Sequence, residues 1–526
     1  MVNETPRRVH DLLHRIPSDG LPAVKSLFCT ELNYGHADVP LSYRGWPDRA
    51  REALTGPPVV LARHESQFGD FDVIHATLAP EQRGRNFPLS ITAERQVIEQ
   101  LLANHPYAIF LFSDVDQRHW HLVNVRYDEE AARRRVFRRI AIGPHERLRT
   151  ASERVAMLDL ATLDEDLFGI PPLAVQQRHD EAFDVEAVTG RFFADYRRLF
   201  EATEAQIEGL ADEDLRLFTQ RLFNRLLFIT FLERKGWLTF EERDDYLRAL
   251  WEDHLEEAEA AADGSDANFY FYRDRLKLLF FSGLNNISNI DIAGINREGF
   301  IVERIGRVPY LNGGLFEKEA LDQREGVTVP DAVFGPIFDE LIYHYNFTVT
   351  ESTPLDIEVA VDPEMLGRIF EELVTGRHES GSYYTPKPVV SFMCREALKG
   401  YLRDACPRED AEAVADFVDG RDAAALRHPE AVLAALQEVR VCDLACGSGA
   451  YLVGMLHELI EMRQALFVSR GVDARAVYDK KLEVIQRNLY GVDVDPFAVN
   501  IARLRLWLSL TVEFDADRDD ISFPIE

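Results

Sequence analysis

The sequence predicts an α/β chain built in three parts, and three observations support this division. Short segments rich in branched and aromatic residues recur up to about residue 170. From Asp184 the apolar residues instead recur at intervals of three and four, which is typical of helices. From about residue 376 helical and strand-like segments alternate. We therefore predict a mixed α/β amino-terminal domain (1–170), a helical middle domain (171–360) and a carboxyl-terminal part with parallel strands (361–526).

Length and composition exclude several classes of protein. With 526 residues, 46% of them hydrophobic and 28% charged, the chain can bury more than one core, so a mainly disordered protein is excluded. No apolar stretch approaches the roughly 18 residues of a membrane-spanning helix. The first residues do not resemble a secretory signal, and five scattered cysteines do not form a disulfide framework. We expect a cytoplasmic protein that does not associate with membranes.

Strands are predicted along the amino-terminal part and helices along the middle of the chain. The strand-like segments cover residues 57–64, 71–78, 107–114, 119–127 and 134–143. Helical spacing covers residues 183–202 and 212–236, and further helices are expected near 241–261, 270–282, 331–345 and 362–375. The helix 212–236 ends at Lys235 and Gly236, a common stop signal.

Arginines cluster around the last predicted strand of the amino-terminal part, on an otherwise acidic chain. The net charge is −31, so the overall field does not attract nucleic acid. The cluster includes Arg133, Arg134, Arg135, Arg138 and Arg139. On neighbouring strands it predicts a positive ridge that could contact the phosphates of double-stranded DNA. Arginines paired with nearby acids are the alternative.

The segment that begins at Val439 carries the strongest sign of chemistry. A buried strand (439–444) runs into a turn of small residues (445–449) and then into an amphipathic helix. Gly447 and Gly449 leave the backbone of the turn open to a ligand, and the helix start offers free N–H groups. A packed strand–turn–helix that binds nothing is the alternative.

A second strand, 489–496, places Asp493 at its carboxyl end, where open parallel sheets bind ligands. A carboxylate there can accept hydrogen bonds from the two hydroxyls of a ribose. A nicotinamide dinucleotide site is the obvious competitor, but its fingerprint requires a glycine at Leu452 and an acid about 20 residues further on. Asp493 lies 44 residues after Gly449, so this fingerprint fits poorly.

A third segment begins at Gly381. Thr385 is a natural helix N-cap, Pro386 suits the first helical position, and an apolar helix follows. With Lys387 beside it, this helix start could hold a small carboxylate such as that of an amino acid. A capped helix with a purely structural role is the more common case.

Together these segments resemble the adenine-specific DNA methyltransferases, which transfer a methyl group from S-adenosylmethionine to an exocyclic amino group. More narrowly, the chain is similar to the Type IIG restriction–modification methylases with the gamma order of motifs. The motifs that carry the likeness are GSYYTP, DLACGSGAYL and YGVDVDPFAVNIARLRLWLSL. The resemblance implies that 361–526 form the first part of a Rossmann-like methyltransferase domain, and that DNA is modified in restriction–modification or phage defence.

The same resemblance implies S-adenosylmethionine as the cofactor and assigns residues to its site. They are Tyr384, Thr385 and Pro386 at the methionine end, Asp443, Ala445, Gly447 and Gly449 at the amino-acid moiety, Asp493 at the ribose and Val494 near the adenine.

The resemblance further implies a nuclease-like or degenerate domain at the front of the chain. The usual magnesium nuclease site needs a lysine two residues after an acid, and no lysine lies between Lys25 and Lys235. Four acids could bind a metal in another arrangement: Glu65, Asp70, Asp72 and Glu94. Solvated surface acids are the commoner explanation, so we predict no metal site.

The catalytic loop of the family, a D/N-P-P-Y/F tetrapeptide that holds the flipped base, does not occur in the sequence. We therefore predict no catalytic residue and no methyl transfer by this polypeptide alone. We expect half of a split enzyme, the product of a truncated gene or an isolated portion. Its VRVCDL strand would pair with a second polypeptide that carries the remaining strands and a target-recognition domain. The alternatives are a non-catalytic subunit or relic that binds cofactor or DNA for a partner chain, and a methyltransferase for proteins or small molecules.

Overall fold

The computed structural model describes residues 5–80, 89–128, 134–144, 146–163, 169–261, 270–285, 297–306, 308–309, 314–348, 356–373, 385–467 and 474–511. The chain forms two compact units. Unit 1 comprises Met1–Ala194, Tyr343–Phe347 and Ser352–Val361, and unit 2 comprises Asp195–Ile342, Thr348–Glu351 and Asp362–Glu526.

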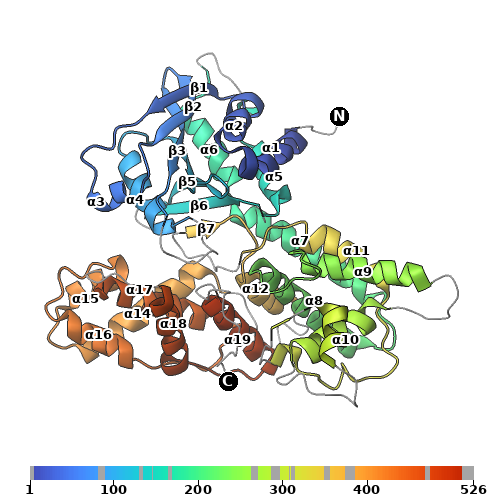
Figure 1. The fold of residues 1–526 in the computed structure, drawn as a ribbon. Helices are drawn as coiled ribbons and strands as arrows, with labels where there is room; N and C mark the ends of the chain where they lie inside the picture. The colour runs from blue at the N-terminus through green and yellow to red at the C-terminus, as the bar shows by residue number, and fades with distance from the viewer. Residues whose placement is uncertain are drawn as a thin grey trace. The chain divides into compact units, whose positions relative to one another are not determined.

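Unit 1 is built on a mixed seven-stranded sheet with the strand order β1-β2-β3-β4-β5-β6-β7 (Figure 1). The strands are β1 (Gly35–Pro40), β2 (Val59–Ser66), β3 (Gly69–Thr77), β4 (Ala108–Ser113), β5 (Trp120–Asp128), β6 (Arg134–Ile142) and β7 (Asp356–Glu358). Neighbouring strands run antiparallel except for the parallel pairs β3–β4 and β6–β7. The five predicted strands are confirmed as β2 to β6, and the structure adds β1 and β7.

Helices cover both faces of this sheet. α4 (Ile91–Leu101) packs against one face through a cluster of buried apolar side chains that includes Phe110. α6 (Pro172–Ala182) covers the opposite face, where the side-chain amide of Asn124 donates to Asp180 at 2.7 Å. The other α-helices that precede α6 are α1 (Thr5–Asp19), α2 (Leu21–Ser26), α3 (Asp48–Glu52) and α5 (Leu148–Ala156).

The boundaries of the two units differ from the predicted domain boundaries at residues 170 and 360. α6 and the first part of α7 (Val185–Glu204) belong to unit 1. β7 does so as well, because the backbone N–H of Val359 donates to the carbonyl of Arg139 at 2.8 Å, just beyond the paired residues. The chain therefore returns to the sheet of unit 1 after it has passed through much of unit 2. Periodicity could not indicate this return, since β7 has only three residues.

The first part of unit 2 is helical, as the spacing of apolar residues predicts. Its helices are α8 (Asp212–Arg234), α9 (Tyr246–Ala261), α10 (Arg297–Ile305), α11 (Phe334–Ile337) and α12 (Glu364–Leu373). α8 ends just before Gly236, whose φ of +76° favours glycine. Within α8, Arg225 forms a buried double ion pair with Asp322 at 2.7 and 2.9 Å. The predicted helices 270–282 and 331–345 are instead successions of short helical turns.

The carboxyl-terminal part of unit 2 alternates helices with two short strands. Its elements are α14 (Lys387–Ala405), α15 (Ala411–Gly420), α16 (Pro429–Glu438), β8 (Val441–Asp443), α17 (Ala450–Phe467), α18 (Ala474–Asn488), β9 (Leu489–Gly491) and α19 (Pro496–Thr511). β8 and β9 pair in parallel, with Val441 opposite Leu489. One apolar core joins α14, α15 and α17 through Leu398, Phe417 and Leu456. The predicted α/β class is confirmed.

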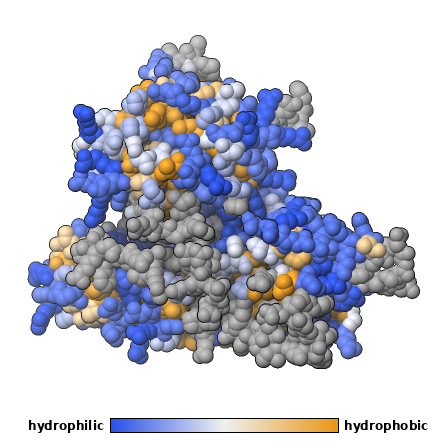
Figure 2. Space-filling view, viewed as in Figure 1, coloured by the Kyte–Doolittle hydropathy of each residue, from blue (hydrophilic) through white to orange (hydrophobic). Residues whose placement is uncertain are grey.

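The described surface is mainly hydrophilic in the view of Figure 2, with apolar residues in small separate areas. Among the helices of the described ranges, none is long and apolar enough to cross a membrane.

Candidate cofactor-binding site

The turn between β8 and α17 adopts a conformation that two glycines make possible. Gly447 has a φ of +51° and Gly449 a φ of +84°, values that other residues seldom adopt. Space restricts Gly449 further, because a Cβ atom there would lie 2.8 Å from the Cβ of Ala502 in α19. The turn therefore runs directly against α19, and the glycines predicted from the sequence are required by the backbone itself.

Asp493 is held against this turn. Its Oδ2 accepts a hydrogen bond from the N–H of Gly447 at 2.8 Å, and its Oδ1 accepts one from the N–H of Asp495 at 2.9 Å. The backbones of the two loops also meet, since the N–H of Cys446 donates to the carbonyl of Val492 at 2.9 Å. The structure thus brings together residues that lie 46 positions apart in the sequence, as the strand order predicts.

Asp443, the last residue of β8, has one carboxylate oxygen without a partner. Its Oδ1 accepts from the N–H of Ala445 at 3.1 Å. Its Oδ2 is buried and has no hydrogen-bond partner among the described residues. A buried carboxylate oxygen of this kind is unfavourable unless a donor reaches it. A ligand ammonium group, such as that of an amino-acid moiety, supplies such a donor.

Apolar side chains surround the carboxyl ends of the two strands. Leu444 is 78% exposed and Val494 is fully exposed. Exposed apolar groups beside a carboxylate are suited to a ligand that has a flat base next to hydroxyl groups. Cys446 lies in the same turn, and burial raises the pKa of its thiol to about 11. The thiol therefore stays protonated near neutral pH, and its burial suits a packing role.

The third predicted segment differs from expectation at the start of α14. The helix begins at Lys387 with Pro386 as its N-cap, and no side chain caps it, so the prediction of Thr385 as the N-cap is wrong. The Lys387 ammonium pairs with Asp362 at 3.0 Å and with Glu364. The ammonium group that was expected to bind a small carboxylate is therefore already paired with two acidic side chains. Tyr384 lies outside the described residues.

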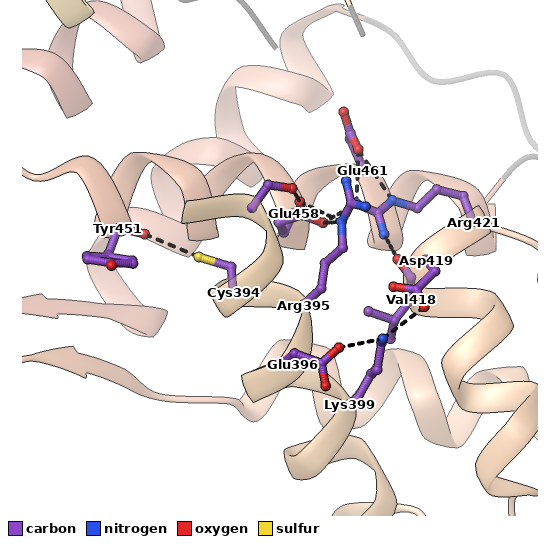
Figure 3. Close-up of polar contacts among 11 residues, drawn as sticks. Cys394, Arg395, Glu396, Lys399, Val418, Asp419, Arg421, Tyr451, Glu458 and Glu461 are labelled. Carbon is purple, nitrogen blue, oxygen red and sulfur yellow. Dashed lines mark hydrogen bonds and ion pairs between the residues drawn. The ribbon is translucent and has the colours of Figure 1, made fainter. Parts of the chain in front are cut away.

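A buried carboxylate joins α14 to the helix that follows the turn. Glu458 of α17 accepts from the hydroxyl of Ser391 at 2.7 Å and from the Nε of Arg395 at 3.0 Å, and it also pairs with Arg421 (Figure 3). The two helices are in close contact, because a Cβ on Gly454 would lie 2.4 Å from Val390. The first turns of α14, which follow Thr385–Pro386, are thereby packed against α17, the helix that follows the glycine turn.

Three of the four acids of unit 1 that could have bound a metal, Asp70, Asp72 and Glu94, are engaged in ion pairs. Asp72 accepts from Arg63 at 2.7 Å and lies 2.6 Å from His105. Glu94 lies 2.5 Å from His121 and 3.2 Å from Arg139. Burial alone would raise the pKa of both carboxyls, but these partners lower it below its usual value. Within the described ranges, no group of three or more His, Cys, Asp or Glu side chains could hold a metal ion.

The arginine cluster is not the continuous ridge that the sequence suggested. Arg139 is buried against Glu94, and Arg138 is largely buried, 3.7 Å from Asp184. β6 lies inside the sheet between β5 and β7, and the guanidinium of Arg138 donates to the carbonyl of Phe183, at the end of α6. Arg135 is partly exposed. Arg133 lies outside the described residues, as does the side chain of Arg134.

Known proteins match the region that contains the turn. Residues 421–520 match the family model described as "MmeI, DNA-methyltransferase domain". A protein of Methanocaldococcus jannaschii, "Putative type II restriction enzyme and methyltransferase RM.MjaORFECS2P", is 30% identical over 321 residues, which are 58% of this chain and 26% of that protein. Over these regions the chain is similar to type II restriction–modification methyltransferases. It spans about a quarter of the length of this curated relative. The matched region of the methyltransferase domain contains Asp443, the glycine turn and Asp493.

Two solved structures show weaker likenesses. The Type IIL restriction-modification enzyme MmeI in complex with DNA has 18% identity and a TM-score of 0.35, over 62% of this chain and 36% of that chain. The DrdV–DNA complex has 12% identity and a TM-score of 0.22, over 97% of this chain and 38% of that chain.

Proposed function

We propose that the chain is the S-adenosylmethionine-binding part of a DNA methyltransferase that modifies the exocyclic amino group of adenine in a restriction–modification or phage-defence system. The observation that carries this proposal is the convergence of Asp443, Asp493 and the glycine turn at the carboxyl ends of β8 and β9. In parallel α/β folds this edge of the sheet is where ligands bind.

The chemistry of the site fits the proposed cofactor. When bound, S-adenosylmethionine supplies an activated methyl group. The unpartnered Oδ2 of Asp443 would accept a hydrogen bond from its ammonium group. Each carboxylate oxygen of Asp493 already accepts one backbone hydrogen bond and can accept another. Both oxygens would therefore accept hydrogen bonds from the ribose hydroxyls. Val494 and Leu444 would pack against the adenine.

The site that binds the target adenine is proposed to be supplied by a second polypeptide. The 526 residues contain no D/N-P-P-Y/F loop, and transfer requires that the amino group be positioned beside the methyl group. β8 pairs with β9, and no other strand of the described ranges pairs with it. A second polypeptide that carries the missing strands, the loop and a recognition domain would add to this edge through main-chain hydrogen bonds. A non-catalytic subunit that binds cofactor or DNA for a partner is the second candidate.

Titration calorimetry with S-adenosylmethionine tests the proposal. Asp493→Ala should weaken binding by about 1.5–3 kcal/mol, the usual contribution of hydrogen bonds to a charged group. Asp416→Ala, which removes an exposed acid of α15, should bind as the parent does. No binding by the parent chain, or equal binding by the Asp493 variant, would contradict the proposed site.

A methyl-transfer assay separates the two candidate functions. Residues 1–526 alone should transfer no labelled methyl group to duplex DNA. Addition of a polypeptide with the missing strands and loop should restore transfer if the chain is part of an enzyme. A chain that binds the cofactor but stays inactive with every such polypeptide is the non-catalytic subunit.

A further inference from the structure

Helix α12 contacts the glycine turn at a point where only glycine fits. A Cβ on Gly367 would lie 2.7 Å from the Oγ of Ser448 and 2.9 Å from the Nη1 of Arg505. The backbone of α12 therefore lies directly against the side chain of Ser448, the residue between the two glycines of the turn. The sequence offered one indication, a glycine within an otherwise amphipathic helix, which can mark a close approach of another segment.

Arg505 of α19 holds the same residue of the turn. Its Nη1 donates to the carbonyl of Ser448 at 3.0 Å and to its Oγ at 3.3 Å. Arg505 and Ser448 are only 4% and 1% exposed, so water cannot easily replace these bonds. The neighbouring N–H of Gly447 is bound by Asp493. Two adjacent residues of the turn are thus fixed by two different side chains.

The start of α12 is also tied to the second cofactor segment. The Lys387 ammonium, at the first residue of α14, lies 3.0 Å from Asp362 and pairs with Glu364. Asp362 in turn accepts from the N–H of Glu364 at 3.1 Å, which fixes it at the beginning of α12. Lys387 directly follows Thr385–Pro386, so α12 contacts both segments that are proposed to surround the methionine part of the cofactor.

We propose that α12 and Arg505 set the position of these two segments before the cofactor binds, which makes Gly367, Arg505 and Lys387 positioning residues. This inference rests on the proposed function. A turn that is already fixed loses little conformational freedom on binding, and preorganisation of this kind raises affinity. α12 contacts Ser448 and Lys387, which adjoin the residues assigned to the methionine part. Asp493, assigned to the ribose, has a second anchor outside the turn in the N–H of Asp495, so α12 is expected to act on the methionine end of the cofactor.

Two substitutions test the inference. Arg505→Lys keeps the charge, but a lysine ammonium does not reproduce the planar donor geometry of the guanidinium. Gly367→Ala places a methyl group against the turn. Each should weaken S-adenosylmethionine binding roughly tenfold, which corresponds to about 1.4 kcal/mol, because each disturbs the two hydrogen bonds between Arg505 and Ser448. Arg503→Lys, at an exposed position of α19, and Gly400→Ala, at an open position of α14, are the matched controls.

Adenosine distinguishes positioning from general damage to the fold. It lacks the methionine part, so both variants should bind it with the affinity of the parent. Unchanged binding of S-adenosylmethionine, or an equal loss for both ligands, would overturn the inference. A parent chain that binds neither ligand would refute the proposed function instead. Hydrogen exchange still decides the inference in that case, because Arg505→Lys should speed exchange at residues 445–449 and unchanged exchange there would overturn it.

Discussion

Gly449→Ala is the substitution for which the structure gives the largest expected effect in the glycine turn. A φ of +84° costs a residue with a Cβ about 1–3 kcal/mol. The added methyl group would also lie 2.8 Å from the Cβ and 3.0 Å from the Cα of Ala502. Ala502 is part of the α19 backbone and cannot rotate away, so overpacking adds about 1–3 kcal/mol. We expect unit 2 to lose about 2–6 kcal/mol of unfolding free energy, a large part of what holds a typical domain folded.

Urea unfolding followed by tryptophan fluorescence measures this loss. Trp507 of α19 is a suitable reporter, because its ring packs 5.4 Å from that of Phe228 and 5.6 Å from that of Trp237. Gly400→Ala is the control, since a Cβ there meets nothing within 4 Å and alanine is favoured over glycine inside a helix by about 0.5–1 kcal/mol. If Gly449→Ala unfolds at the same urea concentration as the parent, the contact with α19 does not constrain the turn as described.

Three further predictions concern other parts of the chain. Glu458→Gln removes the charge that three donors share and should lower the unfolding free energy of unit 2 by about 1.5–3 kcal/mol in the same assay; an unaffected midpoint would mean that the network is only peripheral. Burial lowers the pKa of His75 to about 4, whereas the unfolded chain protonates it near pH 6.5. The unfolding free energy should therefore fall by up to about 3 kcal/mol as the pH falls from 6.5 to 4. The unfolding free energy of His75→Gln should depend less on pH over that interval, and an identical dependence would exclude His75 as the cause. Arg135→Ala should reduce the salt dependence of duplex binding by up to about 0.9 in the log–log slope, whereas an unchanged slope would show that Arg135 contacts no phosphate.

The elements that were predictable from the sequence are those whose pattern is local. β2 to β6 alternate or concentrate branched residues, and α8 repeats its apolar residues along its whole length. The glycine turn and Asp493 were predictable because each directly follows a short apolar strand. The carboxyl ends of two parallel strands lie at the same edge of a sheet. β1 was not predicted, because its side chains are mostly exposed and its sequence therefore lacks the alternation of apolar and polar residues that indicates a strand.

Features that depend on tertiary contacts were not predictable. The sequence shows that Arg138 and Arg139 are basic, but not that the end of α6 and Glu94 contact them on a central strand. Thr385 has the chemistry of an N-cap, yet the helix begins two residues later, with Lys387 bound to two acids. The contact of Gly367 with the glycine turn joins segments about 80 residues apart, which no local pattern encodes.

The return of the chain to unit 1 at β7 has a consequence for synthesis on the ribosome. β6 ends at Ile142, but its partner strand begins at Asp356, about 210 residues later. β7 pairs with residues 137–139 of β6, so at about 5–20 residues per second the backbone groups of these three residues would lack their partners for roughly 10–40 s. During that interval the nascent sheet has a free edge that can pair with other chains. Unit 1 can therefore complete its sheet only late in translation, and expression of residues 1–194 by themselves would leave this edge permanently open.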